Sequence, residues 1–379
     1  THEEINCKHR CLWRNKCMLF KNYILLYDSL FAISSRLAKS ALLYDFFQKH
    51  DVQSCQITCY MLLGQIGPEY STSPFCMSEK SIIALLVRMC KKNEEAVVKL
   101  FQETGDIGTV AEILLENEKK NKTLLMFLED QTDEISLENI VRIFSDLLIT
   151  QGKDSRKLKE DMLINLFSIL SSHAVCILIR MLVRKMQIGV YDKTLLEAGY
   201  HFISSKISYE ILEKAYAVFP DIGFIITVCI KQNVNQLTSL KPCVGIPIVP
   251  AAANSYDSST ILFDQKIPFV FCQPKLDGLR IQAHCSQESV SLFSRNLLNV
   301  TLMYPDIVFH LKSLCCALKI KDLILDGEIV SYDFKNKRYD SFQKTMQRAK
   351  KNNIDATVDA NPVVYVMFDC LLYDTQSLL

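Results

Sequence analysis

The sequence is poor in the features that mark fibrous, disordered or membrane-spanning proteins. It has 11 glycines and 10 prolines among 379 residues, too few for a collagen-like or low-complexity chain. Its formal net charge is only +1, whereas disordered chains combine high charge with low hydrophobicity. The best apolar run, residues 222–230, is about half of the roughly 18–20 residues that cross a bilayer. What remains is a globular chain long enough for two or three domains.

Cysteines, in contrast, are plentiful, and their pattern indicates a reducing compartment. The 15 cysteines are odd in number and lie in apolar runs such as 174–177 and 314–317, where they act as small hydrophobic side chains. We therefore expect an intracellular protein, cytoplasmic in a bacterium or virus and nuclear in a eukaryote. An N-terminal group of candidate zinc ligands lacks paired Cys-x-x-Cys spacing and favours an irregular leader over residues 1–21. This group comprises His2, Cys7, His9, Cys11 and Cys17.

Residues 22–240 have the periodicity of α-helices. Apolar residues recur three and four positions apart, as in residues 82–86 (IIALL). Turn signals such as residues 64–68 (GQIGP) divide the pattern, and Ser136 is placed to begin a helix. These observations predict an all-α domain over 22–240.

The pattern changes at residues 241–250, where three prolines predict an extended linker rather than a helix. Strand-like runs follow, with a helix expected over 305–318. The runs are 269–272, 280–283, 290–293, 323–325 and 363–368. Residues 241–379 are therefore predicted to form an α+β domain with mainly antiparallel strands.

Basic side chains gather near the end of an apolar helical segment, at Arg180, Arg184 and Lys185, and Lys193 follows in the next expected helix. Such a cluster can contact phosphates. By its charge pattern alone, an ordinary solvated helix face is the better interpretation.

Residues 275–280 (KLDGLR) carry the first candidate for chemistry, between two strand-like runs. The lysine amine can act as a nucleophile once it is deprotonated, which nearby cations or a metal ion favour. The glycine leaves room for a phosphate. Taken alone, this short pattern is equally compatible with a chance surface turn.

Three further side chains stand at the ends of later strand-like runs. Arg295 offers a guanidinium for phosphate or ribose, and Glu328 offers a carboxylate for a metal ion or a sugar hydroxyl. Phe368 offers a ring on which a base can stack. Each one alone would be a surface ion pair or a core residue. A lysine, an arginine, a carboxylate and an aromatic ring on successive strand ends together predict a nucleotide pocket.

This ordered set resembles the covalent nucleotidyltransferases and, among them, the ATP-dependent DNA ligases. The similarity covers residues 23–379 and includes segments outside the pocket motifs. These segments are 62–64 (LLG) with Pro68 and Tyr70, 105–108 (GDIG), 188–194 (IGVYDKT), 244–250 (VGIPIVP) and 304–307 (YPDI). The resemblance implies a multi-domain fold: an all-α DNA-binding domain, then an α+β nucleotidyltransferase domain with ATP-grasp-like antiparallel sheets.

The resemblance also implies a reaction. Lys275 would attack the α-phosphate of ATP, expel pyrophosphate and form a lysyl-AMP adduct. The AMP would pass to the 5′-phosphate at a nick in duplex DNA, and the 3′-hydroxyl would then displace it. Mg²⁺ would neutralise charge that develops at phosphorus.

Individual roles follow from the matched motifs. Gln273 would contact adenine, at a position where many family members have glutamate. Arg280 and Arg295 would bind ribose and phosphate, Glu328 would engage metal or ribose, and Phe368 would stack on adenine. The basic cluster is reinterpreted as a set of minor-groove phosphate contacts. Its members are Arg180, Arg184, Lys185 and Lys193.

Later motifs of the family have no counterpart before Leu379: a second metal-binding glutamate, a lysine pair and an OB domain. We therefore expect a catalytic domain that is incomplete at its C-terminus, in a fragment with little or no ligation by itself. The expected partner is nicked duplex DNA, with no membrane and a monomeric state. An RNA ligase or capping guanylyltransferase stays open, disfavoured by the long helical domain. A non-catalytic DNA-binding module also stays open, disfavoured by the intact Lys275.

Overall fold

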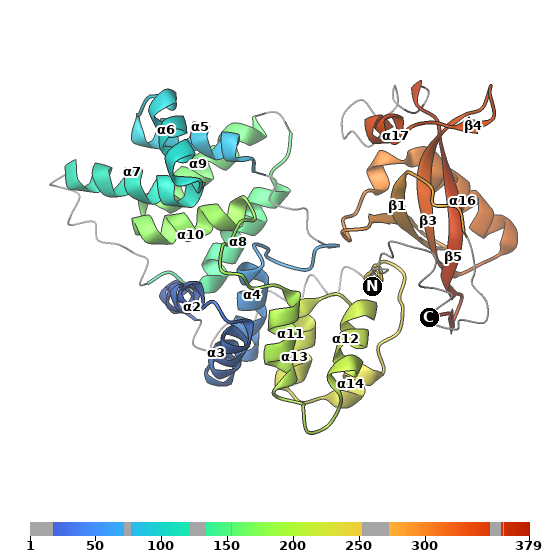
Figure 1. The fold of residues 1–379 in the computed structure, drawn as a ribbon, viewed down its shortest axis with the longest axis horizontal. Helices are drawn as coiled ribbons and strands as arrows, with labels where there is room; N and C mark the ends of the chain where they lie inside the picture. The colour runs from blue at the N-terminus through green and yellow to red at the C-terminus, as the bar shows by residue number, and fades with distance from the viewer. Residues whose placement is uncertain are drawn as a thin grey trace, which may run out of the picture. The chain divides into compact units, whose positions relative to one another are not determined.

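The computed structural model describes residues 18–71, 77–121, 134–152, 154–251, 273–348, 358 and 360–379. The predicted leader, its Cys/His group and the strand-like run at 269–272 lie wholly or almost wholly outside these ranges. The chain divides into two compact units (Figure 1). The first comprises Thr1–Gly67, Pro74–Ser205 and Ile222–Gln232, and the second comprises Pro68–Ser73, Lys206–Asp221 and Asn233–Leu379.

The described part of the first unit is built from helices, as the periodicity predicts. Its helices are α2 (Phe20–Ala32), α3 (Arg36–Lys49), α4 (Val52–Leu62), α5 (Glu79–Cys90), α6 (Glu94–Thr104), α7 (Ile107–Asn121), α8 (Leu137–Ile149), α9 (Ser155–Ser168), α10 (Ser172–Leu182), α11 (Asp192–Tyr200) and α13 (Ile222–Ile230).

Side-chain caps define many of these helix starts. Six polar residues accept a hydrogen bond from a backbone N–H of the first turn, which satisfies a donor that the helix itself leaves unpaired. They are Ser35, Asp51, Ser78, Asn93, Ser136 and Ser171. The helix start predicted at Ser136 is therefore confirmed.

Helix α10 runs through the core of the first unit. Every residue from Ala174 to Leu182 is buried, including Arg180. Helix α7 crosses it closely at Gly108, where an added Cβ would lie 2.9 Å from the carbonyl oxygen of Cys176. Because only glycine permits this approach, Gly108 places the start of α7 directly against α10.

The second unit contains an antiparallel sheet with the order β2-β1-β3-β5-β6, and β4 pairs with β3 (Figure 1). Its elements are α12 (Tyr209–Val218), α14 (Val234–Thr238), β1 (Leu279–Ser286), β2 (Val290–Ser294), a 3₁₀ turn (Thr301–Met303), α16 (Pro305–Leu318), β3 (Asp322–Asp333), β4 (Arg338–Tyr339), α17 (Phe342–Arg348), β5 (Val363–Tyr373) and β6 (Gln376–Ser377). Helix α16 has the predicted bounds, and the predicted fold class is confirmed.

Residues 243–250, predicted as an extended linker, are fixed to the sheet. The Gln282 side chain makes two hydrogen bonds with the backbone of Ile248: it accepts from the N–H at 2.9 Å and donates to the carbonyl at 2.6 Å. The buried His284 accepts from the N–H of Gly245 at 3.2 Å, and burial lowers the pKa of His284 to about 3, so the ring is neutral. Ile248 joins a second apolar cluster with Ile324.

The boundary between the two compact units does not coincide with the proline-rich residues 241–250. Residues 206–221 and 233–240 group with the sheet, and the N–H of Val249 donates to the carbonyl of Ala217 in α12. The domain boundary between 240 and 241 stays a prediction. Within the described ranges, no helix is both long and apolar enough to cross a membrane.

His173 joins three helices of the first unit through two ion pairs. Its ring contacts Asp28 of α2 at 2.8 Å and Glu112 of α7 at 2.9 Å. Burial lowers the pKa of His173, but the hydrogen bonds and charges of the two carboxylates outweigh it, and the pKa is raised above 6.5. The protonated ring therefore stabilises the folded unit, fully below about pH 6 and progressively less as the pH rises through the raised pKa.

We therefore expect the thermal midpoint of the helical unit to fall as the pH rises from 6 to 8. The effect is small, because these side chains are partly exposed and solvent screens them. Circular dichroism melts of the wild type and of His173→Gln measure it, with His201→Gln as the control. An equal pH dependence in wild type and His173→Gln would contradict the assignment.

Candidate functional site

The second unit has a cavity of about 1000 Å³, lined in part by residues of β1, β3 and β5. The structure brings all six predicted catalytic and nucleotide-binding side chains into its lining. They are Gln273, Lys275, Arg280, Arg295, Glu328 and Phe368. They come from the segment before β1, from β1, from the end of β2, and from β3 and β5. These positions lie far apart in the chain, and the pairing of the strands in the sheet brings them together.

Lys275 lies in an exposed, irregular segment that leads into β1. Gly278 brings this segment against β3: its N–H donates to Oε1 of Glu328 at 3.1 Å. A Cβ at Gly278 would collide with the carbonyl oxygen of Ile329 and lie 2.9 Å from Cγ of Glu328. The glycine is therefore required for close approach of two strands, and this approach places Lys275 beside Glu328.

Arg280 is held in place by Asp326, a residue to which the sequence motifs assigned no role. Nε of Arg280 donates to both carboxylate oxygens of Asp326 at 3.2 Å, and Nη2 donates at 2.7 Å. These bonds raise the pKa of Arg280. Asp326 is 3% exposed, and the guanidinium lies 5.8 Å from the ring centroid of Phe368. The sequence feature that could have identified Asp326 as a site residue is its position in the 325–328 (LDGE) run, two residues before Glu328 on the same strand.

We expect Asp326→Asn to weaken ATP binding about tenfold, because one charge-assisted bond to Arg280 is lost and the guanidinium is no longer fixed. Calorimetric titration with ATP measures the change. Asp333→Asn, near the far end of the same strand, is the matched control. If Asp326→Asn bound ATP as the wild type does, Arg280 would not need its partner.

Phe368 points into the cavity because β5 is irregular there. Asp326 pairs with Asp369, but the next residue, Gly327, pairs with Met367. Phe368 is thus the extra residue of a β-bulge, which breaks the alternation of the strand and turns its side chain. Met367 and Phe368 are 50% and 43% exposed, and they give the cavity an apolar wall suited to a base.

The polar side of the cavity is positively charged. Its described lining has three cations, Lys275, Arg280 and Arg295, and one carboxylate, Glu328. Burial raises the pKa of Glu328, although the bond from Gly278 and the neighbouring cations act against this. Such a lining suits a phosphorylated ligand with an aromatic part. Across the described ranges, no three His, Cys, Asp or Glu side chains are grouped to hold a metal ion. Glu328 alone suits Mg²⁺ that is bound mainly through ligand phosphates.

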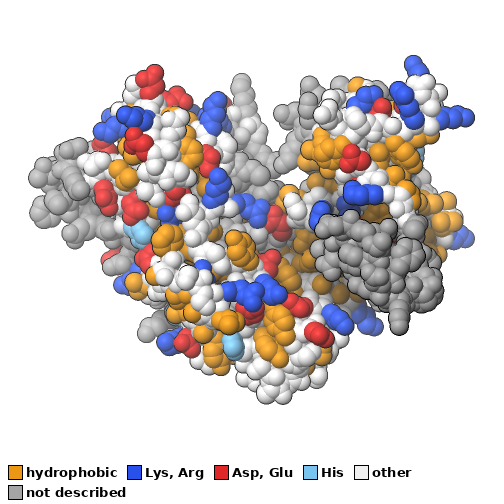
Figure 2. Space-filling view, in the orientation of Figure 1, with side chains coloured by type: hydrophobic (Ala, Val, Ile, Leu, Met, Phe, Trp, Pro, Cys, Tyr) orange, Lys and Arg blue, Asp and Glu red, His pale blue; other side chains and the backbone are white. Residues whose placement is uncertain are grey.

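The predicted DNA contacts divide into one buried and three exposed residues. Arg184 and Lys185 are exposed on the α10–α11 loop (residues 183–191), and Lys193 is exposed in the first turn of α11. Lys185 pairs with Glu79 at 2.6 Å. In the view of Figure 2, basic and acidic side chains are interspersed over the helical unit.

The prediction that Arg180 contacts DNA is wrong, because its side chain is 8% exposed and turned into the protein. Its Nε and Nη2 donate to one oxygen of Asp106, at 2.9 and 2.8 Å. Nη1 donates to the hydroxyl of Tyr27 at 3.0 Å. The guanidinium makes these hydrogen bonds within the first unit, so it is not placed to contact a DNA phosphate.

Comparison with known proteins gives a consistent result for both parts of the chain. Residues 19–199 match the model "DNA ligase N terminus", and residues 250–379 match "ATP dependent DNA ligase domain". The DNA ligase of Sulfurisphaera tokodaii is 30% identical over 94% of this chain and 59% of its own length. DNA ligase 2 of Thermofilum pendens is 28% identical over 93% and 58%.

A mycobacterial DNA ligase D complexed with ATP and MES is 28% identical over 28% of this chain and 31% of its own, with a TM-score of 0.22. The structure named Pmar-Lig_Pre is 16% identical over 92% and 56%, with a TM-score of 0.45. The chain spans just under three fifths of the length of the curated relatives that it matches. On the two models and these relatives together, the chain belongs to the family of ATP-dependent DNA ligases.

Proposed function

We propose that the protein seals nicks in duplex DNA by transferring AMP from ATP, as part of DNA replication, repair or recombination. The observation that carries the proposal is the convergence of Lys275, Glu328 and Phe368 on one positively charged cavity. In this proposal Nζ of Lys275 attacks the α-phosphorus, the bond to the β-phosphate breaks, and pyrophosphate leaves. The amine loses a proton as the nitrogen–phosphorus bond forms.

The other lining residues bind and orient the nucleotide. The apolar wall at Phe368 takes adenine, and Gln273 contacts its edge. Arg280, held by Asp326, and Arg295 bind ribose and phosphate. Glu328 would hold Mg²⁺ together with the phosphates, and the ion would neutralise charge that develops at phosphorus.

Binding to nicked duplex is assigned to the helical unit. Arg184, Lys185 and Lys193 would contact backbone phosphates from the α10–α11 loop and the start of α11. We further infer a monomer that works inside the cell. The cysteines of the described part are free thiols, which suits a reducing compartment.

Incubation with α-labelled ATP or GTP, followed by a denaturing gel, tests the proposal. The chain and the full-length product of its gene are both assayed, and then given nicked duplex. We expect label from ATP, release of label on addition of nicked DNA, and joining of the nick. Label from GTP would favour a capping enzyme. No label from the full-length product, with DNA binding intact, would favour a non-catalytic module.

A further inference from the structure

The α10–α11 loop holds an unusual backbone conformation. Arg184, Gln187 and Gly189 have φ angles of 57°, 59° and 59°, in the left-handed region that disfavours side chains. Two of these three residues carry side chains. Such a conformation persists only where surrounding contacts impose it.

Contacts from three other helices impose it here. Each anchor is a hydrogen bond between a side chain and the loop. They are Tyr27 Oη to the carbonyl of Met186 at 2.5 Å, Lys39 Nζ to the carbonyl of Ile188 at 2.6 Å, and Gln187 Nε2 to Oδ1 of Asp106 at 3.0 Å. Three residues of the loop itself are buried: Met186, Ile188 and Val190. Residues 186–190 of the loop are therefore packed on the first unit.

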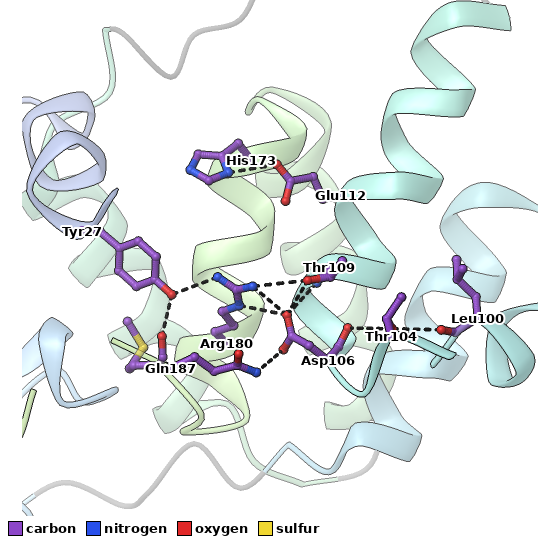
Figure 3. A network of polar contacts seen from close by, with 10 residues as sticks. Tyr27, Leu100, Thr104, Asp106, Thr109, Glu112, His173, Arg180 and Gln187 are labelled. Carbon is purple, nitrogen blue, oxygen red and sulfur yellow. Dashed lines mark hydrogen bonds and ion pairs between the residues drawn. The ribbon is translucent and has the colours of Figure 1, made fainter. Parts of the chain in front are cut away.

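Two of the anchors belong to one network, which centres on Asp106 at the start of α7 (Figure 3). The Asp106 carboxylate accepts from the N–H and hydroxyl of Thr109 at 2.9 and 2.7 Å, from Arg180, and from Gln187. Arg180 in turn donates to the hydroxyl of Tyr27. The network thus closes a ring: Asp106 meets the loop directly through Gln187, and indirectly through Arg180 and Tyr27.

We propose that Asp106, Arg180 and Tyr27 are positioning residues that hold the α10–α11 loop in the conformation that presents Arg184 and Lys185 to DNA. The proposal rests on the proposed function of this loop. A pre-ordered loop binds more tightly because less conformational entropy is lost on association. Arg180 then contributes to DNA binding through the loop and not by contact.

Tyr27→Phe is the decisive variant, since Tyr27 is 1% exposed and cannot touch DNA. Tyr23→Phe is its matched control: Tyr23 lies one turn earlier on α2, is fully buried, and its hydroxyl has no partner in the described part. Binding of labelled nicked duplex is measured by anisotropy at several salt concentrations. We expect Tyr27→Phe to raise Kd about tenfold and Tyr23→Phe to leave it unchanged. The salt slope stays the same in both, because no phosphate contact is removed.

Three comparisons separate positioning from contact and from general stability. Lys185→Ala removes a cation and is expected to lower the salt slope by about one. Gln187→Ala frees the loop, so amides of residues 183–191 exchange hydrogen faster without DNA, whereas Gln102→Ala on α6 leaves them unchanged. Ile82→Val, a core truncation on α5, lowers the melting temperature without changing Kd.

The outcomes distinguish this proposal from the proposed function. Failure of the wild type to bind duplex would refute the DNA-binding role and the positioning role with it. Binding by wild type and by Tyr27→Phe with the same Kd would overturn the positioning role alone. A loss in Tyr27→Phe that Ile82→Val reproduces would also overturn it, because general stability would then explain the effect.

Discussion

Replacing Lys275 with alanine is expected to abolish covalent attachment of AMP, a loss of more than about a thousandfold, because the reacting nitrogen itself is removed. Lys275 is exposed in an irregular segment, so the fold tolerates the change. The measurement is label retained on a denaturing gel after incubation of the full-length product with α-labelled ATP. Melting temperature is followed in parallel and should not move.

Two further variants sharpen this result. Lys312→Ala removes an exposed lysine from α16, outside the cavity lining, and should keep full labelling. Lys275→Arg keeps the charge but should not restore labelling, since a guanidinium does not lose its proton in proteins. Normal labelling of Lys275→Ala would mean that another group carries AMP, and the proposed chemistry of this cavity would be wrong.

Asp106→Ala is expected to cost the helical unit about 3–5 kcal/mol of folding free energy, because Arg180 is left as a buried, unpaired charge. Thr109 and Gln187 lose their acceptor as well. Burial by itself would raise the pKa of Asp106, but its bonds with Arg180 and Thr109 lower it, so the carboxylate is charged. Urea unfolding followed by circular dichroism measures the loss.

A double-mutant cycle tests the cause. Arg180→Met in the Asp106→Ala background removes the stranded charge, so the double variant should be more stable than Asp106→Ala alone. Asp45→Ala, an exposed change on α3, should stay within about 0.5 kcal/mol of wild type. If the Asp106→Ala loss were as small as that of Asp45→Ala, the network of Figure 3 would contribute little to stability.

Much of the fold follows from local pattern. Periodicity and turn residues predict the helical part, Pro305 begins α16 at the predicted residue, and the run at 290–293 lies within β2. The cavity also follows in part, because pairing of the strands brings the motifs together. The prediction that each motif ends a strand is wrong for Glu328 and Phe368, which lie in the middle of β3 and β5. Asp326 was missed because its role depends on a partner 46 residues away across β1 and β3. The bulge at Phe368 depends on the register between β3 and β5, which no local pattern contains.

The sequence by itself determined the order of elements, the ligase motifs and six of the residues that line the cavity. Only the tertiary structure decided the direction of individual side chains. Arg180 and Arg184 stand one helical turn apart in the same basic cluster, yet one is buried against Asp106 and the other is exposed on a loop. The reason is physical: Asp106 lies 74 positions from Arg180, and Gly108 lets α7 approach α10 closely enough for the two charges to meet. A local pattern records which residues are charged, whereas packing determines which charges remain available to DNA.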